Sequence, residues 1–241
     1  GSNAHVTVYH SAEVRENGQL DRTIQDYDAF AERLRAVEGV TRAAPLVKGQ
    51  VMASAGGRNA GIEVFGITEE NLMTIPRIAA PQEAYGDIER FGEGVAIGSG
   101  VARELGVVAG DKIKVISPNG VKTAFGTSPR VKAYEVVYVF TAGRYDIDRT
   151  RVYMPFAEAQ VFFNREGRAD EIEVMVAAPD AVEDMTLPLL RAAGDRAILW
   201  TWKDASGGFL KALDIEDNVM FVILSILVLI AAINIVSGLI M

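Results

Sequence analysis

The chain has 241 residues, no Cys and a formal net charge of −8, from 32 acidic against 24 basic residues. The acidic balance argues against nucleic acid as a partner, and the lack of Cys excludes Cys–His catalysis. Only His5 and His10 are available for Ser–His–Asp catalysis, and no metal-site or P-loop spacing occurs. We therefore expect a chain that is not an enzyme and carries no cofactor.

The first third of the chain predicts an alternation of strands and a helix. Residues 1–4 resemble the scar of a cleaved expression tag and are left out of fold reasoning. Residues 27–37 carry apolar side chains at helical spacing, with Asp26 or Asp28 as the N-cap and Gly39 beyond the end. Strands are expected at 6–9, 40–47, 50–55 and 62–65, with a hairpin turn at 56–59.

The middle of the chain predicts short helices between strands, with 76–91 mostly loop. Ser99 is expected to cap a helix over 99–105, and Pro155 to open a helix over 155–163. A further helix is expected at 68–73, and strands at 112–116, 134–140 and 151–154.

Two features of this region have a catalytic and a structural interpretation. Gly98-Ser99-Gly100 lacks the full spacing of a nucleophile elbow, and a helix N-cap accounts for Ser99 more simply. Asp146 and Asp148 lie among three arginines, a pattern typical of a solvated turn rather than a carboxylate site. We favour the structural interpretation of both.

The residues before the C-terminal run predict a second β-α-β unit, with strands at 171–176 and 198–201 around a helix at 181–193. Two such units around a β-rich insertion indicate an α+β fold, in which a split ferredoxin-like subdomain receives a second subdomain. The expected subdomains are 5–59 with 156–206, the insertion 60–155, and a connecting and membrane helix at 207–241.

The C-terminal residues 219–241 contain no charged side chain, and as a helix they extend roughly 34 Å, enough for a hydrocarbon core of about 30 Å. We expect this truncated membrane helix to be preceded by a non-cytoplasmic domain, because the nearest upstream charges are acidic. Ser225, Asn234, Ser237 and Gly238 are expected to pack between helices. The alternative is that their face lines an entry for lipid-modified cargo.

Residues 117–130 are too long for a tight turn between the strands around them and are bracketed by Pro118 and Pro129. With Phe125 at its centre, this segment is a candidate protein-docking element; a flexible loop with a half-buried Phe is the alternative. Basic residues cluster around it in this acidic chain: Lys112, Lys114, Lys122, Arg130 and Lys132.

Several segments resemble known signatures. Residues 95–107 and 110–113 look like the "I-x-G-x-x-L-A-x-x-L-G-V-x-x-G-D-x-I" pattern of the MacB-like periplasmic domain of ABC-transporter permeases. Residues 137–143, 151–155 and 159–160 resemble its later part. The C-terminal residues are similar to the second membrane helix of the LolC/LolE lipoprotein-releasing permeases, at 216–221, 228, 231–232, 234–237 and 239–241.

This resemblance implies a bacterial inner-membrane permease subunit with the present domain in the periplasm, formed by a ferredoxin-like Porter and an inserted β-rich Sabre subdomain. Two permease subunits would pair with a cytoplasmic LolD-type ATPase dimer, extract lipoprotein cargo from the membrane lipid and pass it to the carrier LolA. An efflux or mechanotransmission permease of the MacB or FtsX type is the alternative. The resemblance leaves open whether this is the carrier-docking, cargo-binding or hybrid subunit.

In the carrier-docking member, a protruding Hook loop and adjacent Pad residues bind LolA. Alignment to that member implies the Hook residues Pro118, Val121, Lys122, Ala124, Phe125, Gly126 and Pro129. It implies the Pad residues Lys114, Arg130, Val131 and Lys132. Lys replaces Arg at two Pad positions, and Val131 replaces a polar residue.

Overall fold

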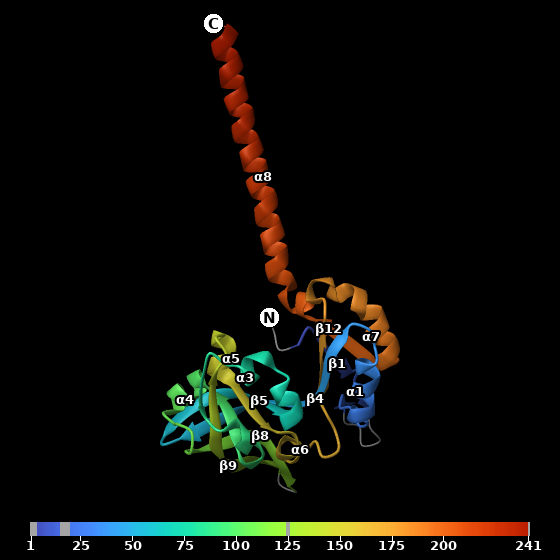
Figure 1. Cartoon of the computed structure of the whole chain (residues 1–241), viewed down its shortest axis with the longest axis vertical. Helices are drawn as coiled ribbons and strands as arrows, with labels where there is room; N and C mark the ends of the chain where they lie inside the picture. Colours follow the sequence, from blue (N-terminus) through green and yellow to red (C-terminus); the bar gives the residue numbers. More distant parts are fainter. Residues whose placement is uncertain (1–3, 15–19, 124–125, 241) are drawn as a thin grey trace. The chain divides into compact units, whose positions relative to one another are not determined.

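The computed structural model describes residues 4–14, 20–123 and 126–240, without the side chains of 119, 121–123, 126–127, 206–218, 234 and 237–240. The chain divides into two compact units, Gly1–Leu199 and Trp200–Met241. The first unit contains a mixed sheet with its covering helices, and the second is the long helix α8 (Trp202–Ile240; Figure 1).

The strand–helix–strand order of the two predicted β-α-β units is confirmed, but the helix predicted over 181–193 is α-helical only from Thr186, because the residues before it form a 3₁₀ helix. Their strands alternate in the order β12-β1-β11-β4, with β11 antiparallel to both of its neighbours, as in a split β-α-β arrangement. Helices α1 and α7 pack against each other (Figure 1). The first unit consists of β1 (Val6–His10), α1 (Tyr27–Arg35) and β4 (Val40–Ala55). The second consists of β11 (Glu171–Val176), α7 (Thr186–Ala193) and β12 (Ala197–Thr201).

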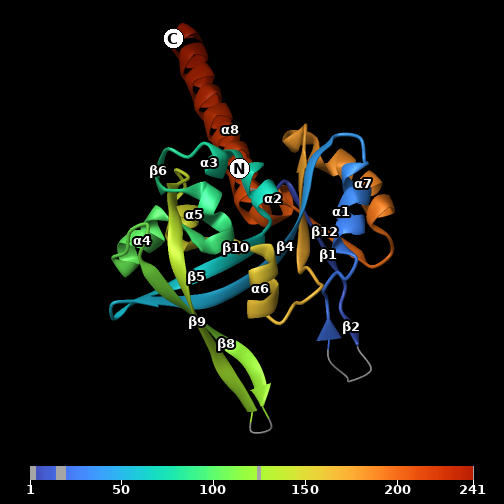
Figure 2. The ribbon, with the colours of Figure 1, turned by 60° about the horizontal axis from the view of Figure 1, so that its bottom comes forward.

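The long strand β4 continues into the β-rich part of the sheet (Figure 2). There the strands close into a ring, because β4 pairs with β5, β5 with β10, β10 with β7, β7 with β9, β9 with β8, and β8 again with β4. The boundaries predicted for two subdomains stay a prediction, since residues up to Leu199 form one compact unit. Besides β4, the ring contains β5 (Arg58–Ile67), β7 (Val95–Gly98), β8 (Lys112–Thr123), β9 (Gly126–Thr141) and β10 (Arg151–Pro155).

Around β10 both faces of the sheet are buried, and successive residues there alternate between two apolar clusters. In β10, Val152 and Met154 belong to one cluster, while Tyr153 between them belongs to the other. The first cluster is covered by α4 (Ser99–Leu105) and α6 (Phe156–Phe162). The second includes residues of α2 (Glu69–Met73), α3 (Pro76–Ala79) and α5 (Tyr145–Thr150).

Helix α6 approaches the sheet closely because two glycines lie beneath it. A Cβ added at Gly66 would meet the Ala159 Cβ at 2.2 Å, and one at Gly49 would meet the Phe163 ring at 2.1 Å. Gly49 therefore serves a close contact and not a turn. For this reason the two strands expected at 40–47 and 50–55 are one continuous strand, β4.

Several other local predictions are wrong. Residues expected as loop between 76 and 91 include α3 and β6 (Glu83–Gly86), and β6 forms only through its long-range pairing with β9. Ser99 is not an N-cap, because the cap of α4 is Gly98. Likewise Pro155 precedes α6 as its N-cap. The remaining elements are the 3₁₀ helices η1 (Ile88–Glu93) and η2 (Pro179–Met185) and the short strands β2 (Glu13–Val14) and β3 (Leu20–Asp21).

Helix α8 starts at a capping box. The Asp204 carboxylate accepts hydrogen bonds from the backbone N–H and hydroxyl of Thr201, and Thr201 Oγ1 accepts one from the Asp204 N–H in return. From there α8 is continuous through the Gly207-Gly208 pair to Ile240, as predicted. Within the described part of the chain no helix is long and apolar enough for a membrane span, so the span predicted at 219–241 is not found.

Candidate functional site

The predicted loop at 117–130 is not a loop, because β8 and β9 continue through it as a long antiparallel hairpin (Figure 2). Their pairing runs from Lys112 opposite Glu135 to Thr123 opposite Gly126, with a register shift between Ser117 and Val121. Strand pairing across more than ten residues of separation is invisible to local sequence patterns, which explains why the hairpin was missed.

Gly120 lies in the irregular part of this hairpin. A Cβ at this position would lie 2.3 Å from the Arg130 N and 2.4 Å from the Ser128 O, both of them backbone atoms. Only a bare α-carbon fits there, so Gly120 permits the two strands to approach each other at the irregularity.

The predicted Pad residues divide between the two faces of the hairpin. Residues opposite each other in an antiparallel pair share a face, and successive residues alternate faces. Arg130 pairs with Ser117 and Lys132 with buried Val115, whereas Val131 between them pairs with Ile116. Arg130 and Lys132 therefore share a face, and Val131 lies on the other.

The face with Arg130 is occupied by α6. The Arg130 guanidinium donates hydrogen bonds to the carbonyls of Val161 and Phe162, the latter at 2.8 Å, and to the Asn164 Oδ1 at 2.8 Å. These carbonyls belong to the last turn of α6, where the Val161 carbonyl also accepts a hydrogen bond from the Asn164 N–H at 3.3 Å. Arg130 thus serves the domain's own structure.

Lys132 also contacts α6. Its ammonium lies 2.6 Å from the Glu158 carboxylate, which accepts a second hydrogen bond from the Tyr134 hydroxyl at 2.7 Å. Partial burial alone would raise the pKa of Glu158, but the hydrogen bonds from Lys132 and Tyr134 outweigh it and lower that pKa. Burial, followed by Glu158, raises the pKa of the Tyr134 hydroxyl, which stays protonated.

The opposite face of the hairpin, which we call the outer face, is open. Lys114 is exposed and lies opposite Ala133, next to the row formed by Met52, Ile116 and Val131 on β4, β8 and β9. The side chains of Met52 and Val131 are 47% and 54% exposed, which is high for apolar residues in a sheet. The outer face thus combines a cation with exposed apolar side chains.

A pocket of about 680 Å³ opens on the outer face at the base of the hairpin. Met52, Ile116, Pro118 and Pro129 line it, together with residues of β5 that include Gly61. Both prolines lie on hairpin strands, where Pro blocks the addition of a further strand. A partner would therefore contact the face of the hairpin and not extend its edge.

Several predicted site residues lie outside what the structure describes. Ala124 and Phe125, between Thr123 and Gly126 in the chain, lie outside the described residues, and Val121, Lys122 and Gly126 are described only by their backbone. In α8, the Ser225 hydroxyl donates to the Phe221 carbonyl at 2.8 Å. For Asn234, Ser237 and Gly238 only the backbone is described, so packing and a cargo face both stay predictions.

The Asp146–Asp148 segment forms α5 and has a structural role. The Asp148 carboxylate accepts hydrogen bonds from the backbone N–H groups of Ala142, Gly143 and Arg144, at 2.6 to 3.1 Å. It thereby closes the turn between β9 and α5. Among the described residues no group of His, Asp and Glu is arranged to hold a metal ion.

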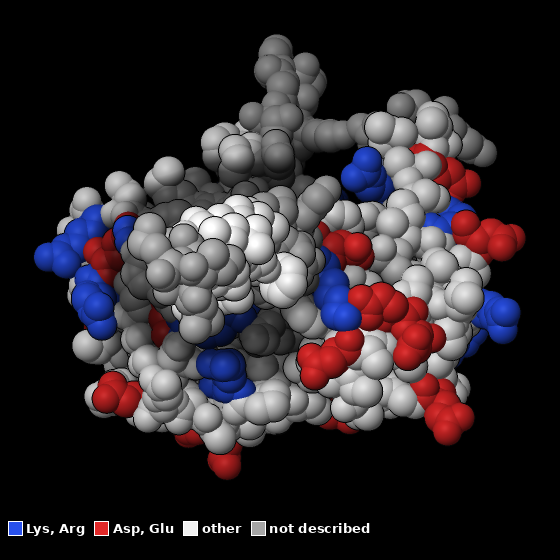
Figure 3. All heavy atoms as spheres, turned by 90° about the horizontal axis from the view of Figure 1, so that it is seen from above, with Lys and Arg blue, Asp and Glu red and all other residues white. Residues whose placement is uncertain are grey.

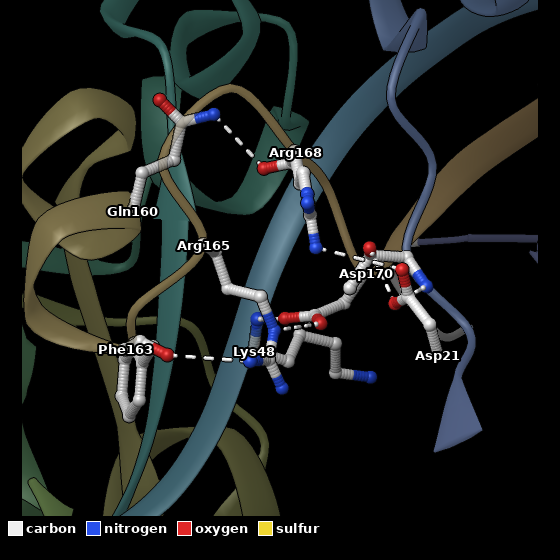
Figure 4. A network of polar contacts seen from close by, with 8 residues as sticks. Asp21, Lys48, Gln160, Phe163, Arg165, Arg168 and Asp170 are labelled. Atoms are coloured by element: carbon white, nitrogen blue, oxygen red, sulfur yellow. Dashed lines mark hydrogen bonds and ion pairs between the residues drawn. The ribbon is translucent and has the colours of Figure 1, made fainter. Parts of the chain in front are cut away.

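Charges elsewhere on the first unit are mostly balanced locally. On the face seen in Figure 3, acidic and basic side chains lie next to one another. In the connection between α6 and β11, Arg165 pairs with Asp170 at 2.8 Å, and Arg168 pairs with Asp21 of β3 at 3.5 Å (Figure 4). These pairs connect parts of the first unit that are far apart in the chain or separated by a turn.

Sequence analysis did not single out Glu158, Asn164 or Met52. Asn164 could have been found, since Asn directly after a helix is a common left-handed terminating residue, and its φ is +56°. Glu158 carries no local signal, because its partners Tyr134 and Lys132 are 24 and 26 residues away in the chain. Met52 carries none either, because its neighbour on the outer face, Ile116, belongs to a strand far along the chain.

Comparison with known proteins identifies similar sequences. The family described as MacB-like periplasmic core domain matches residues 1–186. The lipoprotein-releasing system transmembrane protein LolC of Neisseria meningitidis is 27% identical over 230 residues, covering 94% of this chain and 55% of that protein. LolE of Haemophilus influenzae is 23% identical over 240 residues, covering 97% of this chain and 56% of that protein. The chain thus spans about half the length of these relatives.

Solved structures are similar in fold at low sequence identity. The extracellular domain of the noncanonic ABC-type transporter YknZ from Gram-positive bacteria has a TM-score of 0.53 and 13% identity, with 81% of this chain and 99% of that one covered. The periplasmic region of MacB from Actinobacillus actinomycetemcomitans has a TM-score of 0.50 and 12% identity, with 89% and 94% covered. At such identities the likeness concerns the fold alone.

Proposed function

This chain belongs to the MacB-like periplasmic core domain family, and on that premise we propose that it serves in a lipoprotein-releasing ABC permease. In this role it is the periplasmic part of a non-catalytic inner-membrane subunit. The subunit extracts lipoproteins from the membrane and hands them to a LolA-type carrier. The names of the relatives LolC and LolE, similar over nearly the whole chain, support this assignment.

The single observation that carries carrier docking is the outer face of the β8–β9 hairpin. Lys114 supplies a positive charge there, and Met52 and Val131 supply exposed apolar area beside the pocket at the hairpin base. Protein interfaces combine such an apolar centre with charges that steer association. The predicted tip residue Phe125, outside the described residues, completes the proposed docking surface.

The other partners follow from the family role. A LolD-type ATPase would supply ATP hydrolysis from the cytoplasm, and a second permease subunit would complete the transporter. The same proposal includes the anchoring of 219–241 in membrane lipid. Within that segment, Ser225, Asn234, Ser237 and Gly238 would either pack between helices or line a cargo path. Motion of α8 would then reach the periplasmic domain through one continuous helix.

Carrier docking is tested by measuring binding of a purified LolA-type carrier to the complete chain in mild detergent by surface plasmon resonance. We expect micromolar or tighter binding, weakened about tenfold by Lys114→Glu, because reversing a steering charge slows association. Phe125→Ala is expected to weaken binding similarly. The matched control is Arg191→Glu on α7, which makes the same charge reversal at an exposed site far from the hairpin in sequence.

Two results would contradict the proposal. If the intact chain does not bind the carrier, carrier docking fails, and an efflux or mechanotransmission role becomes the better hypothesis. If Arg191→Glu weakens binding as much as Lys114→Glu, the effect is one of net charge and the outer face is not the docking surface.

A further inference from the structure

We propose that Arg130 and Asn164 are positioning residues that hold the β8–β9 hairpin on the C-terminal end of α6 and present it in one preset orientation. The claim that the hairpin is presented to a protein carrier rests on the proposed function. The claim that the hairpin is held in place is independent of that function. We call the set formed by Arg130, Asn164 and the carbonyls of Gly120, Val161 and Phe162 the hairpin anchor.

The first half of the hairpin anchor is the Arg130 guanidinium, which joins β9 to α6. It reaches two carbonyls of the last helical turn and the Asn164 side chain, so one planar group contacts three acceptors. A cation at this end of a helix is also favoured by the helix dipole. A Lys side chain carries a single ammonium on a flexible alkyl chain, and it does not reproduce the planar set of N–H donors of the guanidinium.

The second half of the hairpin anchor is Asn164, which joins both hairpin strands to α6. Its Oδ1 accepts from Arg130 on β9, and its Nδ2 donates to the Gly120 carbonyl on β8 at 2.9 Å. The side chain reaches both because the backbone of Asn164 is left-handed, with φ of +56°. Non-glycine residues seldom adopt this conformation, and Asn is among those that tolerate it.

The anchor holds the hairpin at its irregular part. Gly120 lies directly after Pro118 and Asn119, within the register shift, where the regular pairing of β8 with β9 is interrupted. Without other support, a bulged two-stranded ribbon with no partner strand beyond it is only marginally stable. Asn164 and Arg130 supply that support at the position where it is needed.

The helix to which the hairpin is held is itself immobilised. Gly49 and Gly66 bring α6 into direct contact with β4 and β5 through Phe163 and Ala159. Asp170 fixes the connection that follows α6. Its carboxylate pairs with Arg165 and accepts a hydrogen bond from the backbone N–H of Lys48 at 2.9 Å (Figure 4). A fixed helix and a fixed hairpin base together set the direction in which the outer face points.

A preset orientation changes the thermodynamics of binding. A hairpin that moves about its base must be ordered when a partner binds, and this ordering lowers the affinity. If only a fraction of the free molecules present the hairpin correctly, the apparent affinity falls by that fraction. The hairpin anchor removes this loss before the partner arrives.

Two substitutions test the anchor by different chemistry. Asn164→Gly keeps the left-handed backbone accessible but removes both side-chain hydrogen bonds, and Arg130→Gln removes the guanidinium. Arg191→Gln on α7 is the matched control, an exposed Arg with no polar partner among the described residues. Hydrogen–deuterium exchange of the complete chain is measured on peptides spanning 117–130, on peptides of α6 and on peptides of β11.

We expect exchange in 117–130 to rise about tenfold in Asn164→Gly and Arg130→Gln, with α6, β11 and the control unchanged. Arg130→Lys is expected to give an intermediate rate. Unchanged exchange of 117–130 in both variants would overturn the anchor. An equal rise throughout α6 and β11 would also overturn it, because the residues would then stabilise the fold in general and not position the hairpin.

Carrier binding tests whether the hairpin anchor presents the hairpin to a partner. We expect both variants to bind the LolA-type carrier about tenfold more weakly, through slower association, because fewer molecules present the hairpin correctly. Wild-type affinity in variants whose hairpin exchanges faster would overturn presentation by the anchor. If the unsubstituted chain does not bind the carrier, the proposed function fails, and the exchange measurement still decides whether the anchor exists.

Discussion

The charge distribution at the base of the β8–β9 hairpin depends on Glu158. Lys132, which belongs to the basic cluster of the sequence, is neutralised by Glu158, whereas Lys114 of the same cluster has no ion pair among the described residues. The formal charges of the two lysines are equal, but only Lys114 offers a free charge to a partner. At the scale of single residues, pairing and not composition determines which cations can steer association.

This pairing predicts a pH-dependent contribution of Glu158 to stability. Because the folded pKa of Glu158 lies below its unfolded value of 4.5, its contribution is present above that value and is lost as pH falls through the lowered folded pKa. Glu158→Gln should cost about 0.5 kcal/mol at pH 7, since Lys132 is half exposed and solvent screens the pair. Urea unfolding at pH 7 and at several pH values below 4.5 checks this. A difference that stays constant across this range would contradict it.

At the scale of elements, a buried ion pair joins strands β4 and β11. Arg42 and Glu173 are each 6% exposed, with the Arg42 Nη1 3.2 Å from the Glu173 carboxylate and its Nε donating to Thr74 Oγ1 at 2.6 Å. Taking both charges out of water costs about as much as their attraction returns. We infer that the pair contributes more to the register of β4 and β11 than to their stability.

Double-mutant analysis tests this inference. Arg42→Met leaves Glu173 buried without its partner and should lower the free energy of unfolding by roughly 3–5 kcal/mol. Arg42→Met with Glu173→Leu should cost much less, because no buried charge remains. Denaturant titration of both variants and of Glu173→Leu completes the cycle. If the double variant is as unstable as Arg42→Met, the ion pair itself provides net stability.

At the scale of the whole molecule, the chain consists of two compact units with different surfaces. The unit Gly1–Leu199 buries its apolar residues in the two clusters around the sheet. In the unit Trp200–Met241, every described side chain from Val219 onward is exposed although nearly all are apolar. Exposed apolar area of this kind adds little to folding stability and favours association.

Removing 207–241 should therefore leave the first unit intact. We expect its unfolding temperature to change by less than about 2 °C, because a loss of well under 1 kcal/mol shifts a domain of this size by no more than that. Circular dichroism melting of the truncated and complete chains in the same detergent measures it. A fall of more than about 5 °C would indicate that α8 stabilises the first unit.

Much of the fold and part of the site could be predicted locally. The left-handed Gly56 and Gly57 at the turn before β5, the Thr68 cap of α2 and left-handed Gly106 after α4 all act on residues within a few positions of themselves. Strand and helix periodicities are local in the same way, so both β-α-β units and the place of the docking segment in the chain were predictable. The family resemblance also depends on the sequence alone.

Tertiary structure decided the rest, because it depends on residues far apart in the chain. Strands were expected at 40–47 and 50–55, yet Gly49 between them lies within one continuous strand, where the Phe163 ring packs against it. The docking segment is a hairpin whose faces differ, since α6 covers Arg130 and Lys132 but not Lys114 and Val131. Sequence by itself thus determined the elements, the family and the place of the docking segment. The packing of α6 beneath that segment determined which of its side chains remain available to a partner.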